Sequence, residues 1–154
     1  MDRFLSHFTH GVDTKGRISV PAAYRQVLAS RGIRDLFTMR DLYLPVMNIG
    51  GSELMSHFES KMETLDPFSQ EYQELAILAY GDGTYLKTDS EGRIVINDLI
   101  RDHTGITDKA TFVGVGKMFQ LWRPEDFEEK LAALRERQSQ PRAAGTRSAG
   151  TAER

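Results

Sequence analysis

The feature that most constrains the fold is an octet that the chain carries almost twice, VDTKGRIS at residues 12–19 and TDSEGRIV at residues 88–95. At an offset of 76 residues (13 to 89), identical or similar residues coincide: Asp13 with Asp89, Gly16 with Gly92, Arg17 with Arg93, Ile18 with Ile94 and Val20 with Ile96. Arg25 then falls on Arg101 without a gap. Because a turn, a strand and a later arginine keep one register, the sequence predicts two copies of one supersecondary unit.

Each octet is typical of a turn that leads into a strand. Asp13 can accept a hydrogen bond from the backbone two residues later, and Gly16 can adopt a positive φ, so DTKG predicts a tight turn or a bulged hairpin loop between two strands. Asp89 and Gly92 repeat this device in the second copy. After each turn, RISV and RIVI place isoleucine or valine at alternate positions, which predicts a short strand with one buried face.

Each of these strands is predicted to run into a helix. Pro21 suits the first helical position, and Asn97 is a favourable N-cap residue. A glycine should end each helix, and the expected boundaries are residues 22–30 before Gly32 and residues 98–104 before Gly105. Two more strands are predicted after each helix, at residues 35–39 and 42–47 in the first copy and at residues 109–115 and 117–122 in the second.

Helices are also predicted between and after the repeats. One should cover about residues 52–65, and the next should begin with Asp66 as its cap and Pro67 at its first position. The apolar residues at helical spacing in this second helix are assigned to the core: Phe68, Tyr72, Leu75 and Ala76. A third helix should begin at Pro124 and carry one apolar face, formed by Phe127, Leu131 and Leu134.

A unit of four short strands and one short helix leaves strand edges unpaired. Two such units can cover each other, so we expect one α+β, mainly β domain, barrel-like and with pseudo-twofold symmetry. The expected segments are residues 5–51 for the first repeat, 52–82 for the connecting helices, 83–126 for the second repeat, 127–138 for the C-terminal helix and 139–154 for a disordered basic tail.

Composition excludes several classes of function. The 154 residues include no cysteine, which excludes disulfides, thiolate metal sites and cysteine nucleophiles. No apolar run approaches the roughly 18 residues of a membrane span, and the start MDRFLSHF lacks a secretory signal, so we expect a cytoplasmic protein. The four histidines are scattered, and GVGKMF lacks the third glycine of a dinucleotide-binding fingerprint. We therefore expect no enzyme, metal, cofactor, small-molecule substrate or membrane partner.

The net charge of −2 is unevenly distributed. Residues 135–154 contain five arginines and two glutamates, a balance of +3, so residues 1–134 carry −5. An acidic body argues mildly against nucleic-acid binding, which would have to depend on a local basic cluster.

The segments VDTKGRISVP and TDSEGRIVI resemble the paired SpoVT/AbrB-type motifs of the MraZ family of bacterial transcriptional regulators. The resemblance covers about residues 3–130. It implies an AbrB-like barrel of the swapped-hairpin or double-psi type, formed by two internal repeats with added helices. It also implies a ring-shaped homo-oligomer, a cytoplasmic location on the nucleoid, and repression of a division and cell-wall gene cluster through promoter DNA with repeated short G-rich boxes.

The resemblance assigns DNA contact to three turn residues: Lys15, Arg17 and Arg93. The turns themselves would be shaped by Asp13, Gly16, Asp89 and Gly92. Two helix residues, Arg25 and Arg101, are secondary candidates whose main expected role is structural, through pairing with nearby carboxylates. Arginine can make bidentate hydrogen bonds with guanine in the major groove, whereas a lysine at position 15 would hold phosphate.

The second copy departs from this pattern at Glu91, which stands where the first copy has Lys15 and would make its turn the weaker DNA contact. It also has Asn97 where the family often has proline, a change that N-capping makes harmless. A ring that presents many such turns to tandem boxes could raise avidity by roughly 10²–10⁴.

Two other interpretations stay open. The turn arginines could serve only as structural ion-pair partners of the turn aspartates. The chain could also be an oligomeric structural or interaction protein that makes only non-specific nucleic-acid contact through its basic tail.

Overall fold

The computed structural model describes residues 2–140 and divides the chain into two units, Met1–Pro124 and Glu125–Arg154. The first unit contains the strands β1 (His7–Gly11), β2 (Arg17–Ser19), β3 (Asp35–Arg40), β4 (Met47–Gly50), β5 (Thr84–Lys87), β6 (Arg93–Val95), β7 (Lys109–Gly114) and β8 (Phe119–Trp122). Its helices are α1 (Ala22–Ser30), α2 (Ser52–Met62), α3 (Gln70–Ala76), the π-helical turn η1 (Ile77–Gly81) and α4 (Asp98–Thr104).

The strands form a six-stranded antiparallel sheet in the order β1-β7-β8-β4-β3-β5 and a separate two-stranded ribbon of β2 and β6. The order of elements within the two repeats relates β1 to β5, β3 to β7 and β4 to β8, and under this exchange the order of the sheet reads the same in reverse. Strands of one repeat therefore pair with strands of the other at both sheet ends, at the centre and in the ribbon. The predicted α+β, mainly β class is confirmed.

Of the two alternatives predicted for the octet, the tight turn is present and the hairpin loop is not. β1 pairs with β7 while β2 pairs with β6, so the turn joins strands of two different sheets. One strand prediction is wrong. Residues 42–47 do not form a strand, because the Asp41 carboxylate accepts hydrogen bonds from the N–H groups of Tyr43 (3.0 Å) and Leu44 (2.9 Å) and bends the chain. The strand begins only at Met47.

The two repeat helices have the predicted bounds. Asn97 caps α4 by accepting a hydrogen bond from the N–H of Ile100 at 2.9 Å, and Gly105 ends it with a φ of 75°. Pro21 stands one position earlier than predicted, immediately before α1, and its φ of −53° and ψ of 140° are not helical. Its carbonyl oxygen accepts hydrogen bonds from the N–H groups of Tyr24 and Arg25 and so still begins the helix.

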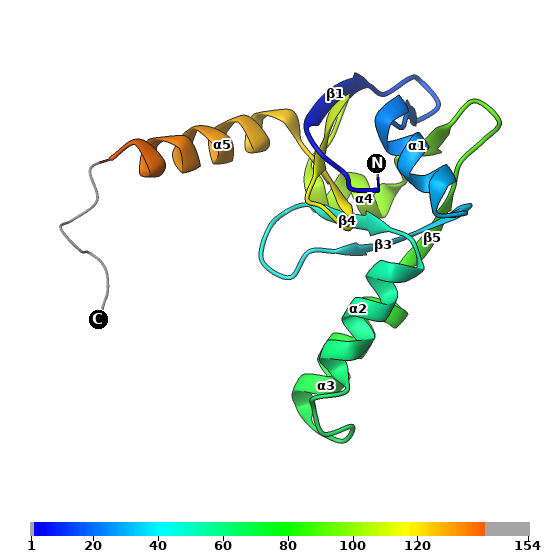
Figure 1. Cartoon of the computed structure of the whole chain (residues 1–154), viewed down its shortest axis with the longest axis vertical. Helices are drawn as coiled ribbons and strands as arrows, with labels where there is room; N and C mark the ends of the chain where they lie inside the picture. Colours follow the sequence, from blue (N-terminus) through cyan, green and yellow to red (C-terminus); the bar gives the residue numbers. More distant parts are fainter. Residues whose placement is uncertain (1, 141–154) are drawn as a thin grey trace. The chain divides into compact units, whose positions relative to one another are not determined.

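The residues between the repeats form a helical arm, which we define as residues 52–82, comprising α2, α3 and η1. In Figure 1 these helices extend away from the strands. The predicted cap is wrong: Asp66 accepts the N–H of Phe68 (3.0 Å) in a turn, and Ser69 caps α3 by accepting the N–H of Tyr72 (3.1 Å). The predicted core role is also wrong, because the side chain of Phe68 is 88% exposed and α3 contains no buried residue.

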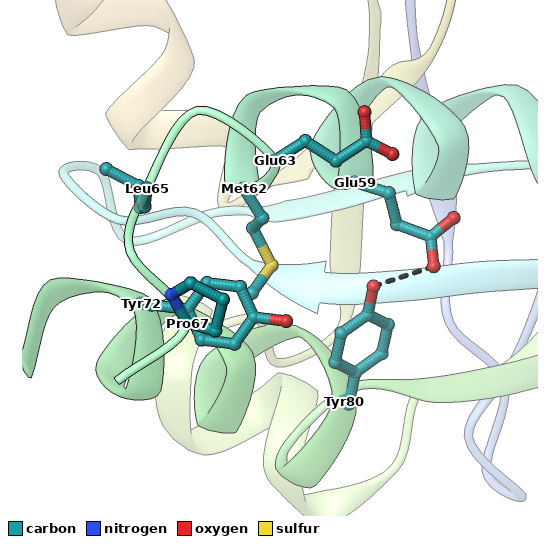
Figure 2. Close-up of a pocket in the computed structure, with 7 residues that line it drawn as sticks. All are labelled: Glu59, Met62, Glu63, Leu65, Pro67, Tyr72 and Tyr80. Carbon is teal, nitrogen blue, oxygen red and sulfur yellow. Dashed lines mark hydrogen bonds between the residues drawn. The ribbon is translucent and has the colours of Figure 1, made fainter. Parts of the chain in front are cut away.

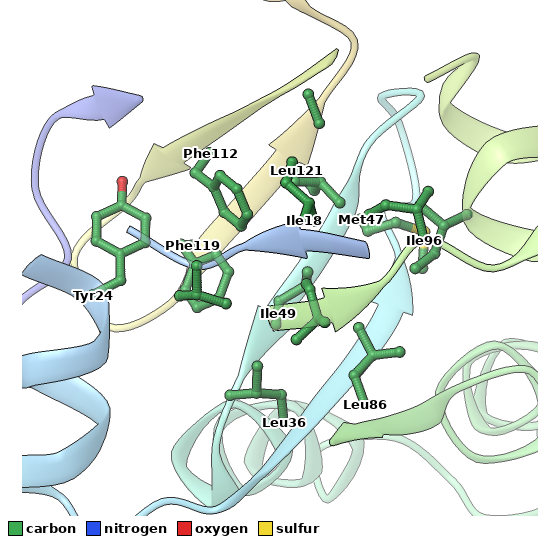
Figure 3. Packing of buried hydrophobic residues seen from close by; sticks show 14 of the residues in the cluster. Ile18, Tyr24, Leu36, Met47, Ile49, Leu86, Ile96, Phe112, Phe119 and Leu121 are labelled. Carbon is green, nitrogen blue, oxygen red and sulfur yellow. The ribbon is translucent and has the colours of Figure 1, made fainter. Parts of the chain in front are cut away.

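The main core lies between the six-stranded sheet, the ribbon and helices α1 and α4. Aromatic rings fill one part of it, with the Tyr24 centroid 5.2 Å from Phe4 and 5.1 Å from Phe119. Figure 3 shows Tyr24 and Phe119 together with the aliphatic residues contributed by the sheet and the ribbon. The Tyr24 hydroxyl donates a hydrogen bond to the carbonyl oxygen of Ser6 (2.7 Å), and burial raises the pKa of this phenol to about 12.

The second unit contains the predicted C-terminal helix, α5 (Pro124–Ser139), which starts at the expected proline. The predicted tail at 139–154 falls largely outside the described residues, which end at 140. Across the described part of the chain, no helix is both long enough and apolar enough to span a membrane.

Candidate functional site

The first turn is organised by a single carboxylate. Asp13 Oδ1 accepts hydrogen bonds from the backbone N–H groups of Lys15 (2.9 Å) and Arg17 (2.8 Å), and its Oδ2 accepts one from Arg17 Nε (2.7 Å). The N–H of Gly16 donates to the Asp13 carbonyl oxygen at 3.0 Å, with the glycine at a φ of +78°. This left-handed conformation favours glycine, because a Cβ atom would be strained there.

The second turn repeats the first bond for bond. Asp89 Oδ1 accepts from the backbone N–H groups of Glu91 and Arg93, both at 2.9 Å, and Oδ2 accepts from Arg93 Nε at 2.8 Å. Gly92 has a φ of +76°. In both copies the arginine after the glycine forms an ion pair with the turn aspartate, the contact that the structural interpretation expects.

Hydrogen bonding lowers the pKa of both turn aspartates below the ordinary value of 3.8. The largest cause is the backbone N–H of Arg17 for Asp13 and that of Arg93 for Asp89. Donors aimed at a carboxylate favour its ionised form. Each aspartate is therefore an anion at neutral pH and holds its arginine by charge as well as by geometry.

We expect Asp89→Asn to be less stable than the wild type at neutral pH, and this difference to shrink as the pH falls below 3.8. A carboxylate whose pKa is lower in the folded state stabilises the fold above its unfolded pKa, and this contribution is lost as pH falls through the folded pKa. Urea unfolding midpoints of both proteins between pH 2.5 and 7 provide the measurement. Asp102→Asn, which removes an exposed carboxylate outside the turns, controls for net charge. A difference that stays constant with pH would contradict the expectation.

The β2–β6 ribbon places the two turns on one surface. Ile18 lies opposite Ile94, and both side chains are fully buried. Because side chains alternate along a strand, the flanking residues face outward together: Arg17, Ser19, Arg93 and Val95. Arg17 and Arg93 are diagonal neighbours on this face, at a spacing of about 7–8 Å between their Cα atoms.

The ribbon also ties each turn to the opposite repeat. The carbonyl oxygen of Gly16 accepts the N–H of Ile96 at 2.7 Å, and that of Gly92 accepts the N–H of Val20 at 3.0 Å. The two turns consequently form the two ends of one short antiparallel ribbon, and neither can shift without disturbing the other.

The two secondary candidates lie at the turns, each against the turn of the other repeat. A Cβ atom added to Gly92 would come within 2.5 Å of Arg25 Cδ, and one added to Gly16 would come within 3.5 Å of an Arg101 guanidinium nitrogen. Neither arginine pairs with a carboxylate within residues 2–140. Arg25 Nε donates to the carbonyl oxygen of Val20 (3.1 Å) and Arg101 Nη1 to that of Thr107 (3.2 Å). The expected carboxylate pairing is not found within residues 2–140, and in that part of the chain both arginines stand beside the turns without an ion-pair partner.

The two turns differ in how much of their charge is free. Within residues 2–140, the ion pair and hydrogen bonds of the Arg17 side chain engage only Nε, and Lys15 is exposed without an ion-pair partner. Arg93 is held at a second point, because its Nη2 lies 3.2 Å from Glu91 Oε2. The hydrogen bond to Asp89 raises the pKa of Arg93. The first turn is thus the better donor to an external acceptor.

The side chains around the turns are mainly cationic hydrogen-bond donors. Across the part of the chain that the structure describes, no group of three or more His, Asp or Glu side chains could hold a metal ion. The ribbon offers guanidinium donors on its outer face, and the first turn adds the ammonium group of Lys15, an arrangement that suits recognition of an extended anion.

Comparisons with known proteins agree with the repeated octets. A family model described as "MraZ protein, putative antitoxin-like" matches residues 80–147. A protein of Rhizobium meliloti (strain 1021), named "Transcriptional regulator MraZ", is 46% identical over 140 residues, which are 91% of this chain and 96% of the relative. The chain belongs to the MraZ family.

Other MraZ relatives match over similar lengths. One from Rhizobium rhizogenes (strain K84 / ATCC BAA-868) is 45% identical over 88% of this chain and 93% of its own length. One from Rhizobium johnstonii is 43% identical over 96% of this chain and its entire length. Both are named transcriptional regulators, which is not an enzyme class, and the resemblance to the MraZ family drawn from the octets is confirmed.

Proposed function

We propose that this chain is a sequence-specific DNA-binding transcriptional regulator that reads short G-rich boxes through its two turns. The observation that supports this most strongly is the outward face of the β2–β6 ribbon, on which Arg17 and Arg93 are diagonal neighbours. The family's regulators supply the context, a promoter of the division and cell-wall gene cluster, at which the chain would act as a repressor.

The ribbon suits the major groove of B-DNA, which admits two antiparallel strands. With Nε fixed by Asp13, the guanidinium of Arg17 keeps its two Nη groups for the O6 and N7 acceptors of one guanine. Lys15, at the tip of the same turn, is placed to hold phosphate and to steer association. Arg25 and Arg101 add positive charge beside the turns.

A single acidic protomer with one strong turn would bind weakly. We propose that the chain forms the ring-shaped homo-oligomer typical of the family, with an AbrB-like barrel in each subunit, and acts on the nucleoid. Contacts of β1 with β2 and of β5 with β6, which bring the ribbon beside both ends of the six-stranded sheet, support the barrel. Repeated turns facing repeated boxes would convert weak contacts into avidity.

A second candidate function is non-specific nucleic-acid contact through residues 135–154, with the turns purely structural. The five arginines of that segment favour it, since the rest of the chain is acidic. Such binding would be indifferent to sequence and would fall steeply with salt.

Fluorescence anisotropy with labelled DNA from upstream of the protein's own gene separates the two candidates. The wild type is compared with a variant in which the five arginines of residues 135–154 are replaced by glutamine, each on the upstream DNA and on a shuffled copy over a salt series. Preference for the upstream DNA that survives the replacement supports the turns. Equal binding to both DNAs, lost with the tail arginines, would refute the proposal.

Replacing Glu91 with lysine is expected to strengthen DNA binding. The change frees Arg93 Nη2 from its contact at 3.2 Å and gives the second turn the residue of the first. We expect affinity to rise by roughly tenfold at low salt, and the plot of log affinity against log salt to steepen by about one counterion. Glu91→Gln, which removes the carboxylate without adding a cation, should show a smaller gain. Unchanged affinity in both variants would indicate that the second turn makes no DNA contact.

A further inference from the structure

The helical arm contains a hollow of about 500 Å³ that the proposed function does not use. Its walls come from α2, from the connection between α2 and α3, and from α3 and η1. Figure 2 shows the residues that line it: Glu59, Met62, Glu63, Leu65, Pro67, Tyr72 and Tyr80. None of them belongs to the turns or to the β2–β6 ribbon, so a ligand in this hollow would leave the turn residues free.

Much of the lining is apolar or aromatic. The side chain of Met62 is only 3% exposed, and Leu65 and Tyr72 are half-buried. The π-helical turn η1 adds the ring of Tyr80 from the other side of the hollow. These surfaces can cover an aliphatic stem and present an aromatic face to a flat group.

Two carboxylates complete the lining. Glu59 and Glu63 stand four residues apart, which places them on the same face of α2. Glu59 Oε2 accepts a hydrogen bond from the Tyr80 hydroxyl at 2.7 Å, drawn as a dashed line in Figure 2, so this carboxylate is held in place. Within residues 2–140, neither glutamate forms an ion pair with a lysine or arginine, and both can accept donors from a ligand.

The charge of the whole arm reinforces that of the hollow. Residues 52–82 contain seven carboxylates and one lysine, a formal charge of −6. Two of the seven are paired with arginines of the first repeat, Glu53 at 3.5 Å and Asp82 at 2.7 Å. Three more carboxylates outside the hollow also lack an ion-pair partner within residues 2–140: Asp66, Glu71 and Glu74. The arm therefore attracts cations along its length.

This chemistry suits a guanidinium group better than other ligands. Carboxylates accept the paired N–H donors of arginine, aromatic faces stack against its plane, and apolar side chains cover its methylene stem. A lysine would find the charge but would lose the planar stacking and the paired hydrogen bonds. Nucleic acids and other anions would be repelled by the free carboxylates.

We propose that the hollow binds an arginine of a basic segment in another protein, which makes the helical arm a docking surface for that partner. Asp66, Glu71 and Glu74 continue the negative charge beyond the hollow and would attract further cations of the same segment. A second copy of this chain is a poorer occupant, because its residues 1–134 carry −5. The proposal does not rest on DNA recognition by the turns.

Methyl NMR of the full-length chain tests the proposal at the hollow itself. Isotope-labelled methionine methyl groups give signals in large assemblies, and Met62 is a buried probe within the lining. A peptide of three arginines alternating with glycines should move the Met62 signal and leave that of Met118, which lies outside the lining, in place. The same peptide with lysines should bind about fivefold more weakly, and an uncharged citrulline version should not bind.

Matched variants separate the hollow from the general charge of the arm. Glu59→Gln combined with Glu63→Gln should weaken binding of the arginine peptide by about tenfold, since two charge-assisted contacts are lost. Glu71→Gln combined with Glu74→Gln removes the same charge from α3, outside the hollow, and should weaken binding by less than about twofold, because salt screens exposed charges. Circular dichroism checks the folding of each variant.

An unmoved Met62 signal, equal affinity for the arginine and lysine peptides, or an equal loss in the Glu71/Glu74 variant would overturn the proposal. A change in the mass of the assembly in the Glu59/Glu63 variant, measured by light scattering, would also overturn it, since the hollow would then be a contact between copies of the chain. Any of these results would leave the function proposed for the turns intact, because that function is tested by DNA binding with variants outside the arm.

Discussion

Replacing Arg17 with alanine is expected to abolish the protein's preference for the DNA upstream of its own gene. A well-placed arginine contributes roughly 1–3 kcal/mol of discrimination between guanine and another base, which is about 5- to 150-fold for each turn. In a ring that engages several boxes, the loss recurs at each contact. We expect Arg17 to be the stronger of the two proposed readers because, within residues 2–140, the side-chain contacts of its guanidinium engage only Nε.

The measurement is fluorescence anisotropy on upstream and shuffled DNA, with the oligomeric state of each variant checked by light scattering. Lys15→Ala provides the matched control from the same turn. It should weaken binding to both DNAs equally and reduce the salt slope by about one, because a phosphate contact carries no sequence information. Arg17→Ala that keeps its preference would show that the turn is not the reader.

The ion pair between Arg17 and Asp13 gives the arginine a structural role that the experiment must separate from DNA reading. Asp13→Asn weakens the hydrogen bond that Arg17 Nε donates to residue 13, and it leaves the Arg17 guanidinium in place. If the arginine only stabilises the turn, Asp13→Asn and Arg17→Ala should reduce binding alike. If it reads bases, Asp13→Asn should retain part of the preference, because the two Nη groups remain.

The parts of the fold that could be predicted from sequence are those set by local chemistry. The bounds of α1 and α4 follow from a proline or asparagine at the start and a glycine shortly after the end. The turns follow in the same way, since an aspartate that accepts N–H groups two and four residues later and a glycine at positive φ are interactions within one octet.

The arm could not be predicted as well, because its sequence contains competing signals. Asp66 and Ser69 are both good N-cap residues, and Pro67 suits a first helical position as well as a turn. The serine caps the helix because Asp66 is used in the turn before it. Phe68 has the spacing of a core residue, yet burial depends on what faces it, and within residues 2–140 its side chain stays largely exposed.

Strand pairing and the places of Arg25 and Arg101 depend on contacts far apart in the sequence. The repeat predicts two similar units, but not that each repeat's helix would lie against the other repeat's turn. The sequence around Arg25 cannot show this arrangement, since Arg25 has the same sequence neighbours whether it contacts its own repeat's turn or the other one. Only the antiparallel pairing of β2 with β6 fixes the choice.

Replacing Ile94 with alanine is expected to destabilise the protein by about 2–5 kcal/mol, the usual cost of removing a large aliphatic side chain from a packed core. Ile94 is fully buried and lies directly opposite Ile18, so the change opens a cavity beneath the middle of the ribbon. Urea unfolding at one fixed protomer concentration gives the measurement, because assembly makes apparent stability depend on concentration.

Val95→Ala is the matched control, since it shortens the next residue of the same strand on the outward face, where Val95 is 50% exposed. We expect it to change stability by no more than about 0.5 kcal/mol. A cost below about 1 kcal/mol for Ile94→Ala would contradict the buried ribbon. Both turns are attached to the ribbon, and the ribbon sets their positions. Ile94→Ala should therefore also weaken DNA binding at temperatures where the protein remains folded. That result would show that the core positions the arginines, because neither arginine has been changed.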